Sequence, residues 1–157
     1  MDIKKNVVEL LNRQIPREYY SEYVYTAISV YFEGLGYFGI AKWLLDHGKE
    51  EHAHGDKFVE YLQDTKQKIV LAKMDAAETE YDCPMTAMKA VLTHEEFITE
   101  SINEIVAAAS KANDYATFFF LQWFVTEQIE EEKRVSDLIL QMELAGDDLL
   151  FLDLEID

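Results

Sequence analysis

The sequence is poor in the residues that interrupt or cross-link a chain. Its 157 residues include two prolines, six glycines and a single cysteine, Cys83. One cysteine excludes an intrachain disulfide and any site built from several cysteines, and it suits a reducing compartment such as the cytoplasm. Because prolines and glycines are the usual helix breakers, their scarcity predicts long helices.

Basic residues are scarce as well. The 14 Lys and Arg stand against 31 Asp and Glu, which gives a formal net charge of −17. Binding to nucleic acid requires clustered cations, so this balance argues against a nucleic-acid partner and favours metal cations or self-assembly around an acidic surface. Long hydrophobic runs are also missing, since the apolar stretch FFFLQWFV is short and contains Gln122. We therefore expect neither export nor a membrane span.

Apolar residues recur at helical spacing over four long segments. We expect helices over residues 4–33, 37–63 and 84–112, and a fourth from a cap at Asp114 to Gly146. The segment 64–83 is long enough to cross the length of a bundle. The tail DDLLFLDLEID predicts a short fifth helix. The fold class is thus all-α: a four-helix up-down bundle with one long crossover between helices two and three, in one domain over residues 1–157. Pro16 is expected to kink or restart the first helix.

Each of the four long helices carries a carboxylate within its apolar stripe. The fourth helix has Leu121, Phe124, Val135, Leu138 and Met142 on one face, interrupted by Gln128 and Glu131. The corresponding interruptions in the first three helices are Glu18, Glu51 and Glu95. In an up-down bundle these side chains can meet at one level. No Lys or Arg lies in the stripes near them, so protons or a metal cluster must compensate their buried charge.

Glu51 and His54 form an E-x-x-H pair, which places both side chains on one helix face. Oxygen ligands with one imidazole suit Fe(II), Mn(II) or Zn(II). The pair alone is a weak signal, but three further stripe carboxylates make a two-metal bundle site the better interpretation.

Four separated motifs extend the pattern over nearly the whole chain: LLNRQIPREYYSEYVY, KEEHAH, THEEFIT and FLQWFVTEQIEEEK. Together, in this order, they resemble the non-haem ferritins of the prokaryotic type. The resemblance implies a ferroxidase centre in which the first iron is held by Glu18, Glu51 and His54. It implies that the second iron is held by Glu51, Glu95 and Glu131, with Gln128 nearby.

The resemblance also implies a third iron site at Glu50, Glu127 and Glu130. Tyr25 matches a family tyrosine beside the centre, where it would donate a hydrogen bond or an electron. Glu132 is expected to be a solvated surface residue and Trp123 a core aromatic. The other histidines, His47, His52 and His94, are expected to be surface or structural residues.

A bacterioferritin would place its haem-ligating methionine at His52 and a second ligand histidine at Glu131, so no haem is expected. The function implied is iron storage: Fe(II) is oxidised by O2 or H2O2 and deposited as ferric mineral inside a hollow homo-oligomeric shell of twenty-four subunits in the cytoplasm.

Two other functions remain open, and a third is disfavoured. One is a di-metal carboxylate oxidase or peroxidase without a storage role. A second is a structural bundle whose buried acids bind Zn(II) or Mg(II) simply to neutralise charge. A DNA-protecting mini-ferritin is disfavoured, because that class builds its site from two subunits and this chain supplies a full ligand set itself.

Overall fold

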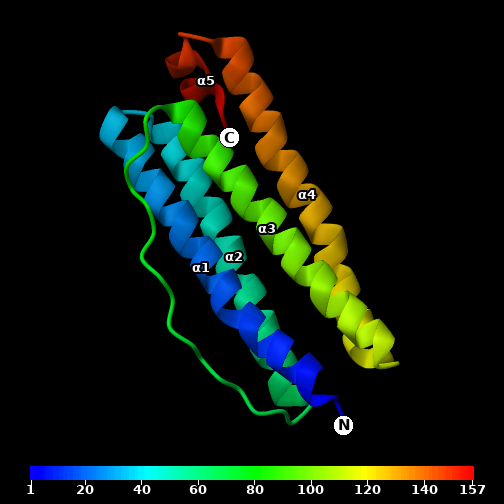
Figure 1. Cartoon of the computed structure of the whole chain (residues 1–157). Coiled ribbons are helices and arrows are strands. Elements are labelled where there is room, and N and C mark those ends of the chain that lie inside the picture. The colour runs from blue at the N-terminus through cyan, green and yellow to red at the C-terminus, as the bar shows by residue number, and fades with distance from the viewer.

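Five helices and no strand make up the computed structural model, which describes residues 1–157 (Figure 1). They are α1 (Lys5–Leu35), α2 (Phe38–Asp64), α3 (Pro84–Lys111), α4 (Tyr115–Ala145) and the short α5 (Leu149–Glu155). The predicted fold class is confirmed, and the predicted helix ends lie within two residues of the observed ones. None of the helices combines the length and apolar character that a membrane span requires.

The helix ends have local chemical causes. Gly36 ends α1 in a left-handed conformation, with φ of 90°, that favours glycine; Gly34, predicted to lie in the turn, is still helical. Pro84 is the first residue of α3, a position where its missing N–H is not needed. Asp114 caps α4 by accepting a 3.0 Å hydrogen bond from the backbone N–H of Thr117.

Pro16 neither ends nor restarts the first helix, since α1 is continuous from Lys5 to Leu35. A proline inside a helix costs about 3 kcal/mol relative to alanine. Its neighbours Ile15 and Glu18 are both fully buried. Packing on both sides of the proline thus holds the chain in the helix, and Glu18 keeps its place on the buried face.

The helices pair as α1 with α2 and α3 with α4. The backbones of the two pairs come closest between α1 and α3, and side chains also join α2 to α4. Residues 65–83 run beside α1 along the length of the bundle, so α2 and α3 point the same way (Figure 1). This crossover is tied to α1 by the side chain of Asn12, which donates to the Lys68 carbonyl at 2.9 Å and accepts from the Val70 N–H at 2.7 Å.

The apolar core is divided into two halves. One half lies near α5 and contains Ile28, Phe32, Leu44, Met88 and Leu138 among its buried side chains. The other lies toward the opposite end and contains Leu11, Phe58, Ile102, Leu121 and Phe124. Between the two halves, all four long helices contribute buried polar side chains. This polar layer contains the carboxylates singled out in the sequence.

The short helix α5 packs against α2 at one glycine. A Cβ atom on Gly39 would lie 2.0 Å from the backbone oxygen of Asp153, and the Asp153 side chain accepts from the N–H of Ile40 at 2.7 Å. We expect Gly39→Ala to displace α5 and lower the free energy of unfolding by about 1–3 kcal/mol.

The measurement is hydrogen exchange of the α5 amides together with thermal denaturation. Gly34→Ala is the matched control, because Gly34 is helical and has no heavy atom within 4 Å of an added Cβ. That substitution should leave α5 protected and stabilise α1 by up to about 1 kcal/mol. Equal protection of α5 in both variants would contradict the close approach.

Candidate metal centre

Four helices bring their buried carboxylates to one level of the bundle. Glu18 comes from α1, Glu51 and His54 from α2, Glu95 from α3 and Glu131 from α4. The most exposed of these five side chains is His54, with 3% of its surface accessible. Their positions follow from the helical repeat, since each replaces an apolar residue on the inward face. The layer therefore concentrates ionisable groups where water is excluded.

One group of potential ligands consists of Glu18, Glu51 and His54, whose candidate ligand atoms all lie within 4.8 Å of one another. His54 Nδ1 lies 3.2 Å from Glu51 Oε2 and 3.8 Å from Glu18 Oε2. Glu18 is oriented through its other oxygen, which accepts from Gln14 Nε2 at 2.8 Å. This set has the composition that suits a divalent first-row transition metal.

A second group shares Glu51 and adds Glu95 and Glu131, again within 4.8 Å. Two side chains donate to Glu95: Tyr25 Oη at 2.8 Å and Gln128 Nε2 at 3.1 Å. Gln128 thus orients a carboxylate in this structure. Because Glu51 belongs to both groups, its two oxygens can serve two metal ions side by side.

The three residues expected at the third site are placed differently from one another. Glu127 lies with His54 and Glu131 in a further group within 4.8 Å. Glu130 is exposed, and Glu50 is paired with Arg134 at 2.9 Å; neither belongs to a compact group of potential ligands. A third metal position at Glu50, Glu127 and Glu130 therefore stays a prediction.

Arg134 is the residue of this layer that the sequence analysis missed. Its Nη1 atom lies 3.3 Å from Glu131 Oε2 and 2.6 Å from His47 Nδ1, in addition to its contact with Glu50. The stripes contain no basic residue near the carboxylates, as predicted, but Arg134 reaches Glu131 from beside the stripe. The available signal was its spacing, because residues three apart are neighbours on a helix.

Burial and mutual repulsion favour the protonated carboxyls. Burial first, and the nearby Glu51 second, raise the pKa of both Glu18 and Glu131 to about 8. The pKa of Glu51 is raised by burial and by Glu95. Burial also raises the pKa of Glu95, although the hydrogen bonds from Tyr25 and Gln128 oppose it. When no metal ion is bound, protons thus neutralise part of the buried negative charge of the layer.

The residues present fit a pair of divalent metal ions. Within the polar layer, three buried carboxylate oxygens accept no hydrogen bond: Glu18 Oε2, Glu51 Oε1 and Glu131 Oε1. A buried polar atom without a partner is unfavourable, and these three belong to the two groups that share Glu51. Oxygen-rich donors with one imidazole match Fe(II), Mn(II) or Zn(II).

Trp123 is not a core residue, contrary to the prediction. It is 42% exposed, and its ring lies 5.3 Å from that of His54 with Lys57 Nζ 4.2 Å above it. The α4 face on which Trp123 lies is only partly covered by α2. Periodicity could not reveal this, because an aromatic residue beside a stripe can pack at its edge or inside it.

The remaining histidines and Glu132 lie outside the ligand groups. His52 is exposed and pairs with Glu22 at 2.7 Å, whereas His47 and His94 are half-buried. His94 Nε2 lies 2.7 Å from Ser21 Oγ, and burial lowers the pKa of His94 to about 4. Glu132 is half-buried and accepts from Thr99 at 3.2 Å.

Comparison with known proteins agrees with this architecture. Residues 8–145 match the family described as the ferritin-like domain. A probable bacterial non-heme ferritin-like protein of Haemophilus influenzae is 37% identical over 146 residues, which are 93% of this chain and 88% of that protein. A bacterial non-heme ferritin of Escherichia coli is 35% identical over 157 residues, covering 98% of this chain and 95% of the relative.

Solved structures give the same result. The open pore ferritin of Archaeoglobus fulgidus superposes with a TM-score of 0.95 at 37% identity, covering 98% of this chain and 97% of that one. A fold match alone would not show common ancestry, but sequence and fold agree here over nearly the full length. The chain therefore belongs to the ferritin family.

Proposed function

We propose that this member of the iron-storage family is a ferroxidase that oxidises Fe(II) within each subunit and stores the product. Two Fe(II) ions bind side by side, one at Glu18, Glu51 and His54 and the other at Glu51, Glu95 and Glu131. Each gives one electron to O2 or H2O2. The Fe(III) formed then moves to a mineral inside a shell built from copies of the chain.

The observation that carries this proposal is the pair of buried ligand groups sharing Glu51. A shared carboxylate holds two metal ions close enough for both to react with one oxidant molecule. Carboxylate oxygens also stabilise Fe(III) relative to Fe(II), because hard anionic ligands favour the more highly charged ion. The chain's own Tyr25 and Gln128 hold Glu95 in place through their hydrogen bonds.

Self-assembly into a shell is supported by the surface of the isolated chain. Large apolar side chains on α4 and α5 are exposed in the isolated chain, including Phe119 at 80%, Leu144 at 88% and Leu154 at 73%. Exposed apolar groups of this size are typical of interfaces between subunits. The net charge of −17 would attract cations to the assembled particle and does not favour nucleic acid.

The rival oxidase or peroxidase without storage shares the same ligand groups and differs in the fate of the oxidised iron. A mini-ferritin site divided between two subunits is disfavoured, because one chain brings both groups together.

The test is anaerobic titration of the metal-free protein with Fe(II), followed by exposure to O2, with absorbance and particle size recorded on the same samples. We expect rapid oxidation of the first two Fe(II) ions per chain, as the two groups sharing Glu51 imply. A large particle should then continue to take up iron. Rapid oxidation in a small particle that saturates at once would favour the oxidase without storage, and oxidation no faster than in buffer would refute both.

A further inference from the structure

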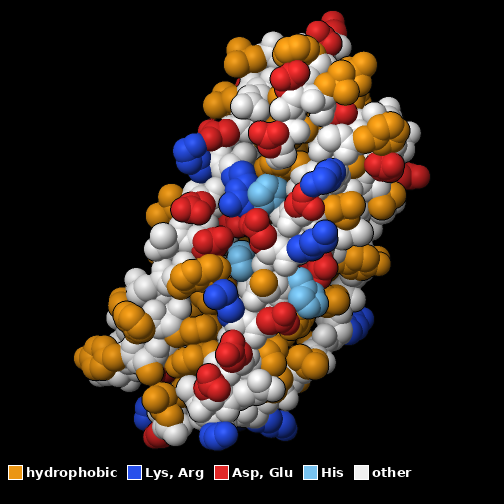
Figure 2. Space-filling model, turned by 180° about the vertical axis from the view of Figure 1, so that it is seen from behind, with side chains coloured by type: hydrophobic (Ala, Val, Ile, Leu, Met, Phe, Trp, Pro, Cys, Tyr) orange, Lys and Arg blue, Asp and Glu red, His pale blue; other side chains and the backbone are white.

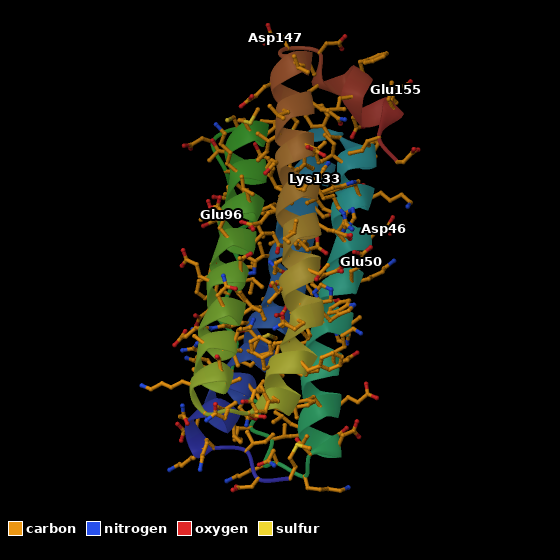
Figure 3. The ribbon with its side chains drawn as sticks, turned by 90° about the vertical axis from the view of Figure 1, so that its right-hand side faces the viewer. Asp46, Glu50, Glu96, Lys133, Asp147 and Glu155 are labelled. Atoms are coloured by element: carbon orange, nitrogen blue, oxygen red, sulfur yellow. The ribbon has the colours of Figure 1, made fainter.

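Arg134 contacts the polar layer on the side that faces α2. Its Nη1 atom lies 2.9 Å from Glu50, 3.3 Å from Glu131 and 2.6 Å from His47 Nδ1. Glu50 and Lys133, the neighbour of Arg134, are labelled in Figure 3 on α2 and α4 where these helices lie side by side. Acidic, basic and histidine side chains gather midway along the face shown in Figure 2. One guanidinium thus joins two carboxylates from different helices.

No other Lys or Arg side chain forms an ion pair with a carboxylate of the three ligand groups. Arg134 contacts Glu131, which belongs to two of those groups, and does not contact Glu18 or Glu51. The same guanidinium pairs with Glu50, whose Oε2 atom lies 3.6 Å from His47 Nδ1. The cation is therefore placed on one side of the layer and not at its centre.

We propose that Arg134 is a built-in competitor for metal at the Glu131 side of the centre. The guanidinium contacts Glu131 Oε2, and Oε1 is free. A metal ion on Oε1 would leave two cations on one carboxylate, and a metal ion that takes Oε2 as well must displace the guanidinium. Either course weakens binding there. The Glu18, Glu51 and His54 position has no such competitor, so Arg134 makes the positions unequal and fixes the order in which they fill.

The arginine can leave without breaking the core. Its side chain is 30% exposed, so the long stem can move toward solvent when metal arrives. An arginine side chain stays protonated in proteins, so the competing positive charge is present whenever the chain is folded.

This inference depends on the proposed metal centre, and its test separates the two. The experiment is anaerobic calorimetric titration of the metal-free protein with Fe(II), comparing the wild type with Arg134→Leu. We expect the ions bound after the first to bind about tenfold more tightly in the variant, whereas the affinity for the first ion changes less than about threefold. No oxidation is involved, so activity does not enter the result.

Lys133→Leu is the matched control, because it removes the same charge one residue along the chain. The Lys133 side chain is exposed and pairs with Asp137, not with a carboxylate of the polar layer. It should bind Fe(II) like the wild type. Arg134→Lys keeps the positive charge and should remain close to the wild type, whereas Arg134→Gln should resemble Arg134→Leu. Circular dichroism of each metal-free sample establishes folding, and the Gln and Lys pair provides the test if the Leu variant does not fold.

Equal Fe(II) affinities in the wild type, Arg134→Leu and Arg134→Gln would overturn the inference while leaving the metal centre intact. So would equal tightening in Lys133→Leu, since the effect would then be one of net charge. A wild type that binds no Fe(II) would refute the proposed function and the inference with it.

Discussion

Glu51→Ala is expected to abolish rapid Fe(II) oxidation and leave the protein folded. Glu51 is the one carboxylate shared by the two groups that we propose as metal positions, so its loss would remove a ligand from both at once. Changes outside the ligand set of metal sites already reduce metal affinity or activity 10–100-fold, so loss of a shared ligand should slow oxidation by at least about 100-fold. The rate is measured from absorbance after O2 is added to the Fe(II)-loaded protein.

The free energy of unfolding of Glu51→Ala should change little, although its rate of Fe(II) oxidation falls. The pKa of Glu51 is raised by burial and by Glu95, so this carboxyl opposes folding of the metal-free protein when it is ionised. Its removal relieves that repulsion and creates a small cavity, and we expect a net change within about 2 kcal/mol. Glu96→Ala is the matched control, because Glu96 lies exposed on α3 (Figure 3). Equal oxidation in both variants would refute the centre, and unfolding of Glu51→Ala would favour the structural bundle.

The stability of the metal-free protein is expected to fall as the pH rises from about 5 to about 9. The pKa of Glu18 and of Glu131 is about 8 in the folded chain, against an ordinary value of 4.5. Between these values the folded state retains protons that the unfolded state has released, so raising the pH favours unfolding. These two pKa shifts correspond to a decrease of several kcal/mol in the free energy of unfolding between about pH 5 and about pH 9.

Thermal denaturation at a series of pH values measures this slope. Bound Fe(II) under anaerobic conditions replaces the protons as the compensating charge, so it should flatten the dependence and raise the stability at pH 8. Glu18→Gln should reduce the slope in the metal-free protein, and the exposed Glu96→Gln should not. If the stability of the metal-free protein is constant or increases between about pH 5 and about pH 9, the buried carboxyls are not protonated in the folded state, and this prediction is wrong.

Much of the fold could be predicted because the signals are periodic. Helical spacing identified the four long helices, and the few prolines and glycines placed their ends. The same periodicity revealed the polar layer, because Glu18, Glu51, Glu95 and Glu131 each occupy an apolar stripe. The geometry brings all four together, as the stripes predicted. Their roles in binding iron still require the experiments above.

The features that were missed depend on neighbours across helices. Arg134 lies beside its stripe, and only the packing of α2 against α4 shows that its long side chain reaches Glu50, Glu131 and His47. Trp123 lies at an edge of α4 that α2 covers only in part, and it is 42% exposed. Pro16 was expected to disturb α1, but local propensity is a weak effect when the residues around it are buried. Spacing along one helix contains none of this information.

The division of the core into two apolar halves has a consequence for how the helices align. One helical turn is about 5.4 Å, so sliding α4 by one turn toward α5 would carry Glu131 to the level of Val135, inside the apolar half of the core that lies near α5. Such a slip buries an ionised group without partners and is strongly unfavourable. The carboxylates thus fix the axial register of four long helices whose apolar faces are otherwise repetitive. The same side chains that make the bundle a candidate iron centre are those that allow it only one alignment.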